Sequence, residues 1–216
     1  MAYQAIIFDL DGTLLDTLED LADSMNSVLN EYGLPEHDLT SYRYFVGEGV
    51  EVLVRKSLPS EKRTDTFIAH CVMRMKEEYG KRWAKKTRPY IGIPEMLDAV
   101  TSRGIRMAVL SNKPDEFTRL IVTSLLPRWQ FPVILGSRSS LPKKPDPTAA
   151  LLIAETLHIP PRNVLFLGDT RIDMETARAA GMYPVGVLWG FRTSDELTSS
   201  GARALISNPA ELLELV

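Results

Sequence analysis

The chain has 216 residues, of which 44% are hydrophobic and 25% charged, which is the composition of an ordinary folded protein. Its formal net charge of −3 argues against a dedicated nucleic-acid-binding protein, and its single cysteine excludes an intramolecular disulfide. The N-terminal stretch lacks the features of a signal peptide, and no apolar run approaches the ~20 residues of a membrane span. We therefore expect a soluble cytoplasmic protein.

Five short runs are apolar almost throughout, which predicts parallel strands that are covered on both faces. In chain order they are residues 4–8, 106–110, 133–135, 164–167 and 185–188. Segments of helical length lie between most of them, and each ends at or near a glycine or a proline, the residues that stop helices. These segments are residues 94–103, 115–126, 148–158 and 173–180. Strands that alternate with helices predict an α/β fold with a doubly wound, mainly parallel sheet.

The interval between the first two strands is too long for one connection, and most of it has a helical pattern. Thr17-Leu18-Glu19-Asp20 resembles a capping box at a helix start, and helical stretches at 49–57 and 64–83 follow. We interpret residues 16–88 as an inserted helical cap domain, and residues 1–15 and 89–216 as the core. The basic run at 81–88 is interpreted as the exposed end of a cap helix rather than as a nucleic-acid site.

Polar side chains follow the predicted strands at their carboxyl ends, where parallel sheets bind ligands. They come from four separate places in the chain, which are Asp9 and Asp11, then Ser111-Asn112-Lys113, then Lys143-Lys144 before two prolines, and finally Gly168-Asp169 with Asp173. Each group has an ordinary explanation when taken alone, such as a helix cap, a solvated loop or a turn. Their convergence on one sheet edge, as a complementary set of acids, a hydroxyl and a lysine, predicts an active site.

The residue types in this set suit phosphoryl transfer. Asp9 and Asp11 are two residues apart, so their side chains leave an extended chain on the same face, and Gly12 lets the backbone pass close to a bound anion. One carboxylate of such a pair can attack while the other moves protons. Asp169 and Asp173, together with Asp9, suggest a magnesium site that offsets the negative charge.

The same residues resemble the motifs of the haloacid dehalogenase superfamily of phosphotransferases. The four matching stretches, in the family's order, are Asp9-Leu10-Asp11-Gly12-Thr13-Leu14-Leu15-Asp16-Thr17, Ser111-Asn112-Lys113, Lys144-Pro145-Asp146-Pro147 and Gly168-Asp169-Thr170-Arg171-Ile172-Asp173. The resemblance implies that Asp9 forms an aspartyl-phosphate and that Asp11 is the general acid and base. It also implies that Ser111 binds the phosphoryl group and that Lys144 holds this group against Asp9.

Further roles follow from the same resemblance. It implies Mg²⁺ as the cofactor, bound by Asp9, by the Asp11 carbonyl, by Asp169 and by Asp173. The residues that we expect to contact substrate are Gly12, Thr13, Gly47, Gly49, Ser111, Asn112 and Lys144. For Gly47 and Gly49 a plain turn before a helix is an equal alternative to a contact with the substrate.

Within the superfamily the chain is most similar to phosphoglycolate phosphatases, in Phe45-Val46-Gly47-Glu48-Gly49 and in Gly186-Val187-Leu188-Trp189-Gly190-Phe191-Arg192. The expected partner is therefore a small phosphorylated metabolite, with no nucleic acid and no membrane, acted on by a monomer or a homodimer. A sugar-phosphate mutase or a pyrophosphatase of the same superfamily is the alternative enzyme. Gly168-Asp169-Thr170 favours hydrolysis, because mutases of this type usually carry Glu-Asp-Ser there. A non-enzymatic phospho-receiver or scaffold is the alternative from another class.

Overall fold

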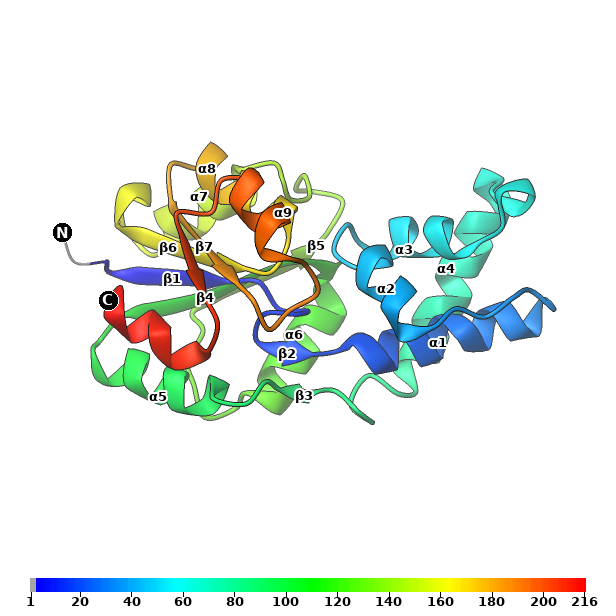
Figure 1. Cartoon of the computed structure of the whole chain (residues 1–216), viewed down its shortest axis with the longest axis horizontal. Helices are drawn as coiled ribbons and strands as arrows, with labels where there is room; N and C mark the ends of the chain where they lie inside the picture. The colour runs from blue at the N-terminus through cyan, green and yellow to red at the C-terminus, as the bar shows by residue number, and fades with distance from the viewer. Residues whose placement is uncertain (1–2) are drawn as a thin grey trace. The chain divides into compact units, whose positions relative to one another are not determined.

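The computed structural model describes residues 3–216 and has a six-stranded sheet at its centre (Figure 1). The strand order is β5-β4-β1-β6-β7-β8, and every neighbouring pair is parallel. The strands are β1 (Ala5–Phe8), β4 (Arg106–Pro114), β5 (Val133–Ser137), β6 (Val164–Gly168), β7 (Tyr183–Val187) and β8 (Ala204–Ile206). The prediction of an α/β core around a parallel sheet is confirmed. The edge strand β8 was not predicted, because three residues give too short an apolar run.

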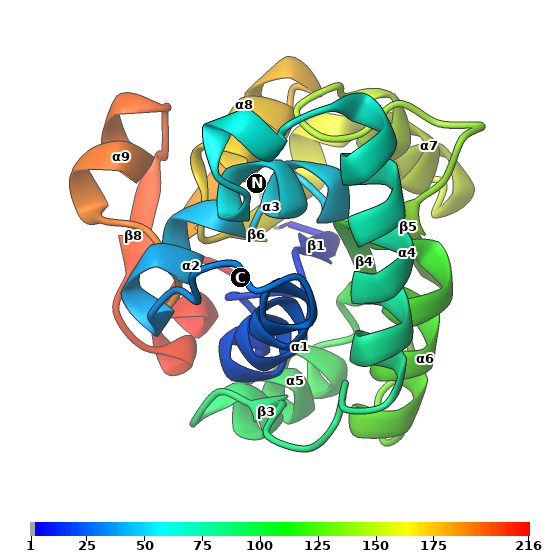
Figure 2. The ribbon, with the colours of Figure 1, turned by 90° about the vertical axis from the view of Figure 1, so that its right-hand side faces the viewer.

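Helices cover both faces of this sheet, which explains why its strands are apolar almost throughout. On one face lie α7 (Thr148–Thr156) and α8 (Arg171–Ala179), and on the other lie α5 (Ile93–Ser102) and α6 (Asp115–Leu125), as Figure 1 shows. Figure 2 shows α8 above β1 and α5 below it. The cluster under α7 and α8 takes alternate residues from the strands, including Ala5, Ile7 and Phe166. The remaining short elements are α9 (Ser194–Ser199), η2 (Pro161–Asn163) and η3 (Pro209–Glu214).

The register of the central strands sets the position of the polar residues. Phe8, the last residue of β1, pairs with Val109 of β4 and with Leu167 of β6. Asp9 and Gly168 therefore emerge at the same level of the sheet, and the Asp9 N–H donates to the Leu167 carbonyl at 2.9 Å. The chain after Val109 reaches Ser111 within two residues at that same edge. Because the strands are parallel, these residues share the carboxyl edge of the sheet.

Residues 16–88 form a second compact unit, distinct from residues up to 15 and 89–216. It contains α1 (Leu18–Glu31), α2 (Leu39–Phe45), α3 (Val50–Ser57), η1 (Ser60–Lys62) and α4 (Asp65–Gly80). Two short strands, β2 (Leu15–Asp16) and β3 (Arg88–Pro89), pair with each other where the chain passes between the units. The predicted helical insertion is confirmed, although α2 was missed. Its role as a cap stays a prediction.

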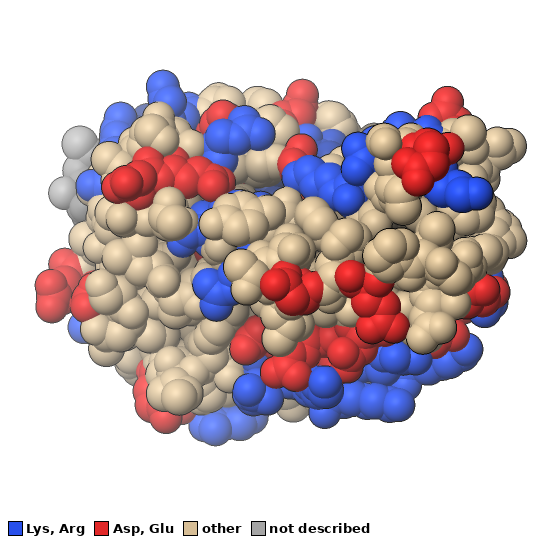
Figure 3. Space-filling view, turned by 45° about the vertical axis from the view of Figure 1, so that its right-hand side comes forward, with Lys and Arg blue, Asp and Glu red and all other residues tan. Residues whose placement is uncertain are grey.

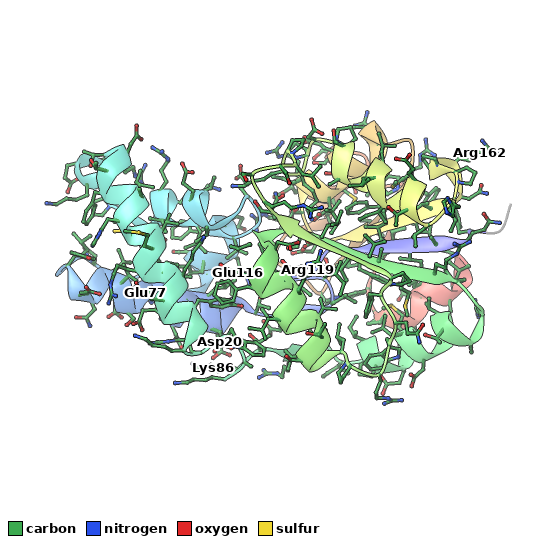
Figure 4. All side chains as sticks on the ribbon, turned by 180° about the vertical axis from the view of Figure 1, so that it is seen from behind. Asp20, Glu77, Lys86, Glu116, Arg119 and Arg162 are labelled. Carbon is green, nitrogen blue, oxygen red and sulfur yellow. The ribbon has the colours of Figure 1, made fainter. Side chains whose placement is uncertain are left out.

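The capping box predicted at Thr17-Leu18-Glu19-Asp20 is wrong. Helix α1 does begin after Thr17, but the Thr17 side chain makes no capping hydrogen bond, and its buried hydroxyl has no partner among residues 3–216. The Asp20 carboxylate instead accepts from the N–H groups of Lys86 and Thr87 and from the Thr87 hydroxyl, at 2.8–3.2 Å (Figure 4). A contact with the distant end of the insertion has replaced the local one, which a sequence pattern does not reveal.

Several basic side chains of the run at 81–88 form ion pairs with acidic neighbours. The Lys86 ammonium lies 3.1 Å from Glu19 and 2.8 Å from Asp23, and Lys81 and Arg82 both bind Glu78 at 2.5 Å. Basic and acidic side chains are interspersed on the face drawn in Figure 3. The paired cations fit the interpretation of this run as a solvated helix end. Among residues 3–216 no helix is both long enough and apolar enough to cross a bilayer.

Candidate active site

The centre of the site is an ion pair between Asp9 and Lys144. Asp9 follows β1 directly, and Lys144 lies in the connection between β5 and α7. The Lys144 ammonium donates to Asp9 Oδ1 at 2.7 Å and to Asp173 Oδ1 at 2.6 Å. All three side chains are buried. A buried ammonium that bridges two carboxylates is held firmly in place, because each charge has lost its water.

Asp9, Asp169 and Asp173 form a group that could bind a divalent cation. Each offers one carboxylate oxygen, and these oxygens lie within 4.8 Å of one another. Asp9 comes from the end of β1, whereas Asp169 follows β6 and Asp173 lies in the first turn of α8. Three hard oxygen donors at this separation match the ligands that magnesium and calcium prefer.

One lysine, Lys144, faces three carboxylates in this group, so their negative charges are not balanced. Burial is the largest effect on the pKa of Asp9; together with the charges of Asp173 and Asp11 it outweighs Lys144 and raises the pKa to about 7. Burial also raises the pKa of Asp169, and the charges of Asp9 and Asp173 add to this effect. For Lys144, burial lowers the pKa, but Asp173 and Asp9 outweigh it and raise the value above its ordinary range. A bound divalent cation would supply the missing charge.

Neighbouring groups fix the orientation of Asp169 and Asp173. Asp169 accepts from the Thr13 hydroxyl at 3.2 Å and from the Phe191 N–H at 2.8 Å. Asp173 Oδ2 accepts from both the N–H and the hydroxyl of Thr170, at 3.1 and 2.7 Å, which leaves Oδ1 for Lys144. The orientation of both carboxylates is thus fixed by hydrogen bonds from neighbouring groups, as is common for carboxylates that bind metal ions.

Glycines allow the backbone to approach these acids closely. Gly12 has φ of 90°, and a Cβ built on it would lie 2.3 Å from Asp169 Oδ2. A Cβ on Gly190 would lie 2.3 Å from the Asp169 Cβ and 2.5 Å from the Gly12 carbonyl oxygen. The Trp189 indole N–H donates to the Thr13 carbonyl at 2.9 Å in the same region. The segment after β7 therefore packs directly on the loop that carries Asp9 and Asp11.

The Asp11 carboxylate forms an ion pair with Lys113, a different lysine from the one that binds Asp9. The Lys113 ammonium donates to both oxygens of the Asp11 carboxylate, at 2.8 and 3.0 Å, and both side chains are largely buried. The sequence contained Lys113 within Ser111-Asn112-Lys113 but gave it no role. A lysine just before a predicted helix ordinarily faces water, so no sequence signal marked it as a partner of Asp11.

Asn112 connects two of the predicted stretches. Its side-chain amide donates to the Lys144 carbonyl at 3.0 Å, and its side-chain oxygen accepts from the Lys144 N–H at 2.9 Å. Ser111 is buried, and its hydroxyl oxygen accepts from the Lys113 N–H at 3.2 Å. Asn112 therefore holds the backbone that carries Lys144, and the direct substrate contact expected for it stays a prediction.

The structure brings Asp9, Lys144, Asp169 and Asp173 together, and it places Thr13 against Asp169. Gly47 and Gly49 lie in the other compact unit, with φ of 120° and 94°, and their contact with substrate stays a prediction. Sequence reasoning missed the parts played by Lys113, Thr170 and the Phe191 N–H. All three lie within stretches that resemble the family, Lys113 in Ser111-Asn112-Lys113, Thr170 in residues 168–173 and Phe191 in residues 186–192, but such a match does not show which group each one contacts.

Residues 6–187 match the family model described as haloacid dehalogenase-like hydrolase. The chain belongs to this family. The match covers all the strands that carry the site and most of the helices around them.

Relatives with similarity over nearly their whole length agree with this assignment. The chain is 34% identical over 213 residues to a phosphoglycolate phosphatase of Aquifex aeolicus, covering 99% of this chain and 96% of that protein. It is 32% identical to a phosphoglycolate phosphatase of Nitrosospira multiformis, with 99% and 95% covered. A crystal structure of a candidate phosphoglycolate phosphatase from Lactobacillus delbrueckii subsp. bulgaricus superposes with a TM-score of 0.92, at 30% identity and with 99% and 98% of the two chains covered. This member of the family is thus a homologue of phosphoglycolate phosphatases.

Proposed function

We propose that the chain is a magnesium-dependent phosphatase that hydrolyses a small phosphomonoester of the phosphoglycolate type, with Asp9 as the nucleophile. The observation that carries the proposal is the Asp9 carboxylate at the end of β1, held by Lys144 within a group of three buried acids. The shared name of the full-length relatives supports the substrate class.

In the first half of the proposed reaction, an Asp9 oxygen attacks the phosphorus atom and the bond from phosphorus to the alcohol oxygen breaks. Asp11, as a carboxylic acid, gives its proton to the departing oxygen, so that a neutral alcohol leaves. In the second half, Asp11 as a carboxylate takes a proton from water as the water attacks phosphorus. The bond from phosphorus to the Asp9 oxygen then breaks, which regenerates Asp9 and releases inorganic phosphate.

The substrate is an anion, so the acids around Asp9 have to be offset. Lys144 places one positive charge beside the attacking oxygen, and Ser111 and the backbone near Gly12 are suited to bind phosphoryl oxygens. Asp9, Asp169 and Asp173 would hold Mg²⁺, with the Asp11 carbonyl as a further ligand, and the bound ion supplies charge that neutralises the phosphoryl oxygens. The close approach of these three buried carboxylates supports this, because a bound cation would offset the mutual repulsion that contributes to the raised pKa values of Asp9 and Asp169.

The helical insertion would close over the substrate and exclude water, with Gly47 and Gly49 offering backbone N–H groups. This role is part of the proposal and rests on the resemblance to capped phosphatases. The cytoplasmic location and the oligomeric state remain predictions from the sequence.

The test is a phosphate-release assay with excess Mg²⁺ or with EDTA, over 2-phosphoglycolate, hexose phosphates, nucleotides and pyrophosphate. We expect metal-dependent turnover with 2-phosphoglycolate among the best substrates. Asp9→Asn should abolish it, and the matched surface control Asp98→Asn should not, since the Asp98 carboxylate bonds only Arg128 and Trp129 among residues 3–216. Turnover on no substrate, or full activity of Asp9→Asn, would disprove the proposal.

Two results would reassign the enzyme within the same fold. Conversion of glucose 1-phosphate to glucose 6-phosphate would identify a mutase, and activity restricted to pyrophosphate would identify a pyrophosphatase. A stable aspartyl-phosphate without turnover would indicate a phospho-receiver.

A further inference from the structure

The Asp11 carboxylate is held by one side chain. Both of its hydrogen bonds within residues 3–216 come from the Lys113 ammonium, one to each oxygen, at 2.8 and 3.0 Å. The Lys113 side chain is 4% exposed and that of Asp11 is 11% exposed. An ion pair this buried differs from the many surface pairs of the chain, whose partners are free to reorient in water.

The backbone around Asp11 does not by itself fix this side chain. Asp11 precedes Gly12, which has φ of 90°, so the chain turns sharply there and the strand geometry that directs Asp9 has ended. Lys113 lies beyond Leu110, at the point where the pairing of β4 with β5 shifts register. At this position the Lys113 side chain is buried rather than exposed at the surface.

The two aspartates of Asp9-Leu10-Asp11 are thus held by different lysines. Lys144 contacts Asp9 and Asp173, whereas the bonds to Asp11 come from Lys113. The proposed reaction gives the two aspartates different tasks, one forming a bond to phosphorus and the other moving protons. Each task needs its own fixed geometry, because a displacement of about 1 Å can cost ~100-fold in rate.

We propose that Lys113 is a positioning residue for Asp11, and this role rests on the proposed phosphatase function. Lys113 donates to both oxygens of the Asp11 carboxylate and so fixes the position of that group. In the first step one oxygen carries the proton and gives it to the departing alcohol, while the other still accepts from Lys113. In the second step the deprotonated oxygen takes a proton from the attacking water. Lys113 keeps its own protons throughout, so the proton balance of the reaction is unchanged.

The experiment measures kcat and KM with Mg²⁺ for the unaltered protein, Lys113→Met, Lys113→Arg, Asp11→Asn and the double variant Asp11→Asn/Lys113→Met. The substrates are 2-phosphoglycolate, whose alkoxide needs a proton to leave, and p-nitrophenyl phosphate, whose phenolate does not. We expect Lys113→Met to lower kcat on 2-phosphoglycolate about 10- to 100-fold with KM changed less than about threefold. The loss should be smaller on p-nitrophenyl phosphate, and Lys113→Arg should recover part of it.

The double variant separates positioning from a direct role. If Lys113 acts through Asp11, its removal should cause no further loss once Asp11 is Asn. The double variant also leaves no unpaired buried carboxylate, so it remains informative if Lys113→Met fails to fold. A further loss in the double variant equal to that of Lys113→Met, or a raised KM with kcat unchanged, would overturn the role of Lys113 alone. Absence of turnover by the unaltered protein would overturn the proposed function and this role with it.

Discussion

The site contains two aspartate–lysine pairs that differ in what surrounds them. The pair of Asp9 with Lys144 is shared with a third group, Asp173, and lies beside Asp169. The pair of Asp11 with Lys113 uses both oxygens of a single carboxylate and stands slightly more open to solvent. Two aspartates that lie two residues apart can thus have different surroundings, because each carboxylate is bound by a different lysine.

Replacement of the aspartates themselves should show the largest difference between the pairs. We expect Asp9→Asn to lower kcat on the order of 10⁴-fold or more on any substrate, because no other group forms the bond to phosphorus. Asp11→Asn should cost about 10²- to 10⁴-fold on 2-phosphoglycolate and less on p-nitrophenyl phosphate. Steady-state kinetics with both substrates measure this, and equal losses for Asp9→Asn and Asp11→Asn on the aryl ester would remove the distinction.

The two lysines should differ in their contribution to stability. Lys144→Met leaves two buried carboxylates without their cation and should cost about 3–5 kcal/mol of unfolding free energy. Lys113→Met leaves one carboxylate, which is partly accessible to water, and should cost less. Urea unfolding in EDTA measures both. The reverse order of stabilities would show that the Asp11 pair, and not the Asp9 pair, anchors the site.

Replacement of Asn112 should affect only the pair of Asp9 with Lys144. Asn112→Ala removes the two hydrogen bonds that hold the Lys144 backbone, and we expect a loss of about 1–3 kcal/mol in stability. Activity should fall with little change in KM, since the Lys144 ammonium would be misplaced beside the attacking Asp9 oxygen while the other expected substrate contacts remain. Asn30→Ala is the matched control, because the Asn30 amide bonds Glu36 at the surface of the other unit. A rise in KM without a loss of kcat would indicate that Asn112 contacts substrate instead.

The pH dependence of stability should follow the titration of Asp9. The pKa of Asp9 in the folded protein is about 7, above its ordinary value of 3.8, so the folded state binds more protons than the unfolded state between these values. Without a divalent cation, the Asp9 contribution to stability should therefore fall as pH rises from about 4 to about 7. Added Mg²⁺ should stabilise the protein more at pH 8 than at pH 5. Unfolding curves at both pH values test this, with Asp9→Asn as the control in which the dependence should flatten.

Much of the core could be predicted because its physical rule is simple. Apolar runs separated by helices define a parallel sheet, and parallel strands bring the residues after Phe8, Leu110 and Leu167 to one edge. For this reason the sequence predicted that Asp9 and Asp169 lie close together. The role of each acid stays a prediction, because position alone does not show what a carboxylate does.

The contacts that were missed depend on tertiary structure rather than on local pattern. The Lys113 side chain reaches Asp11 near a register shift in β4, which has no signature in the residues of that strand. The Asp20 carboxylate does not cap the start of α1 as expected. It accepts hydrogen bonds from Lys86 and Thr87, which lie far along the chain. In both cases the tertiary structure, rather than the local sequence, determines which group the polar side chain contacts.

The central claim is that Asp9 becomes phosphorylated during turnover. The direct measurement is rapid acid quench of Asp11→Asn reacting with p-nitrophenyl phosphate and Mg²⁺, followed by peptide mass spectrometry. The aryl ester needs no proton to leave, whereas attack by water lacks its base, so the phosphorylated enzyme should accumulate. We expect one phosphoryl group per chain, located on Asp9. A phosphoryl group on another residue, or turnover with no phosphorylated protein at any time point, would contradict it.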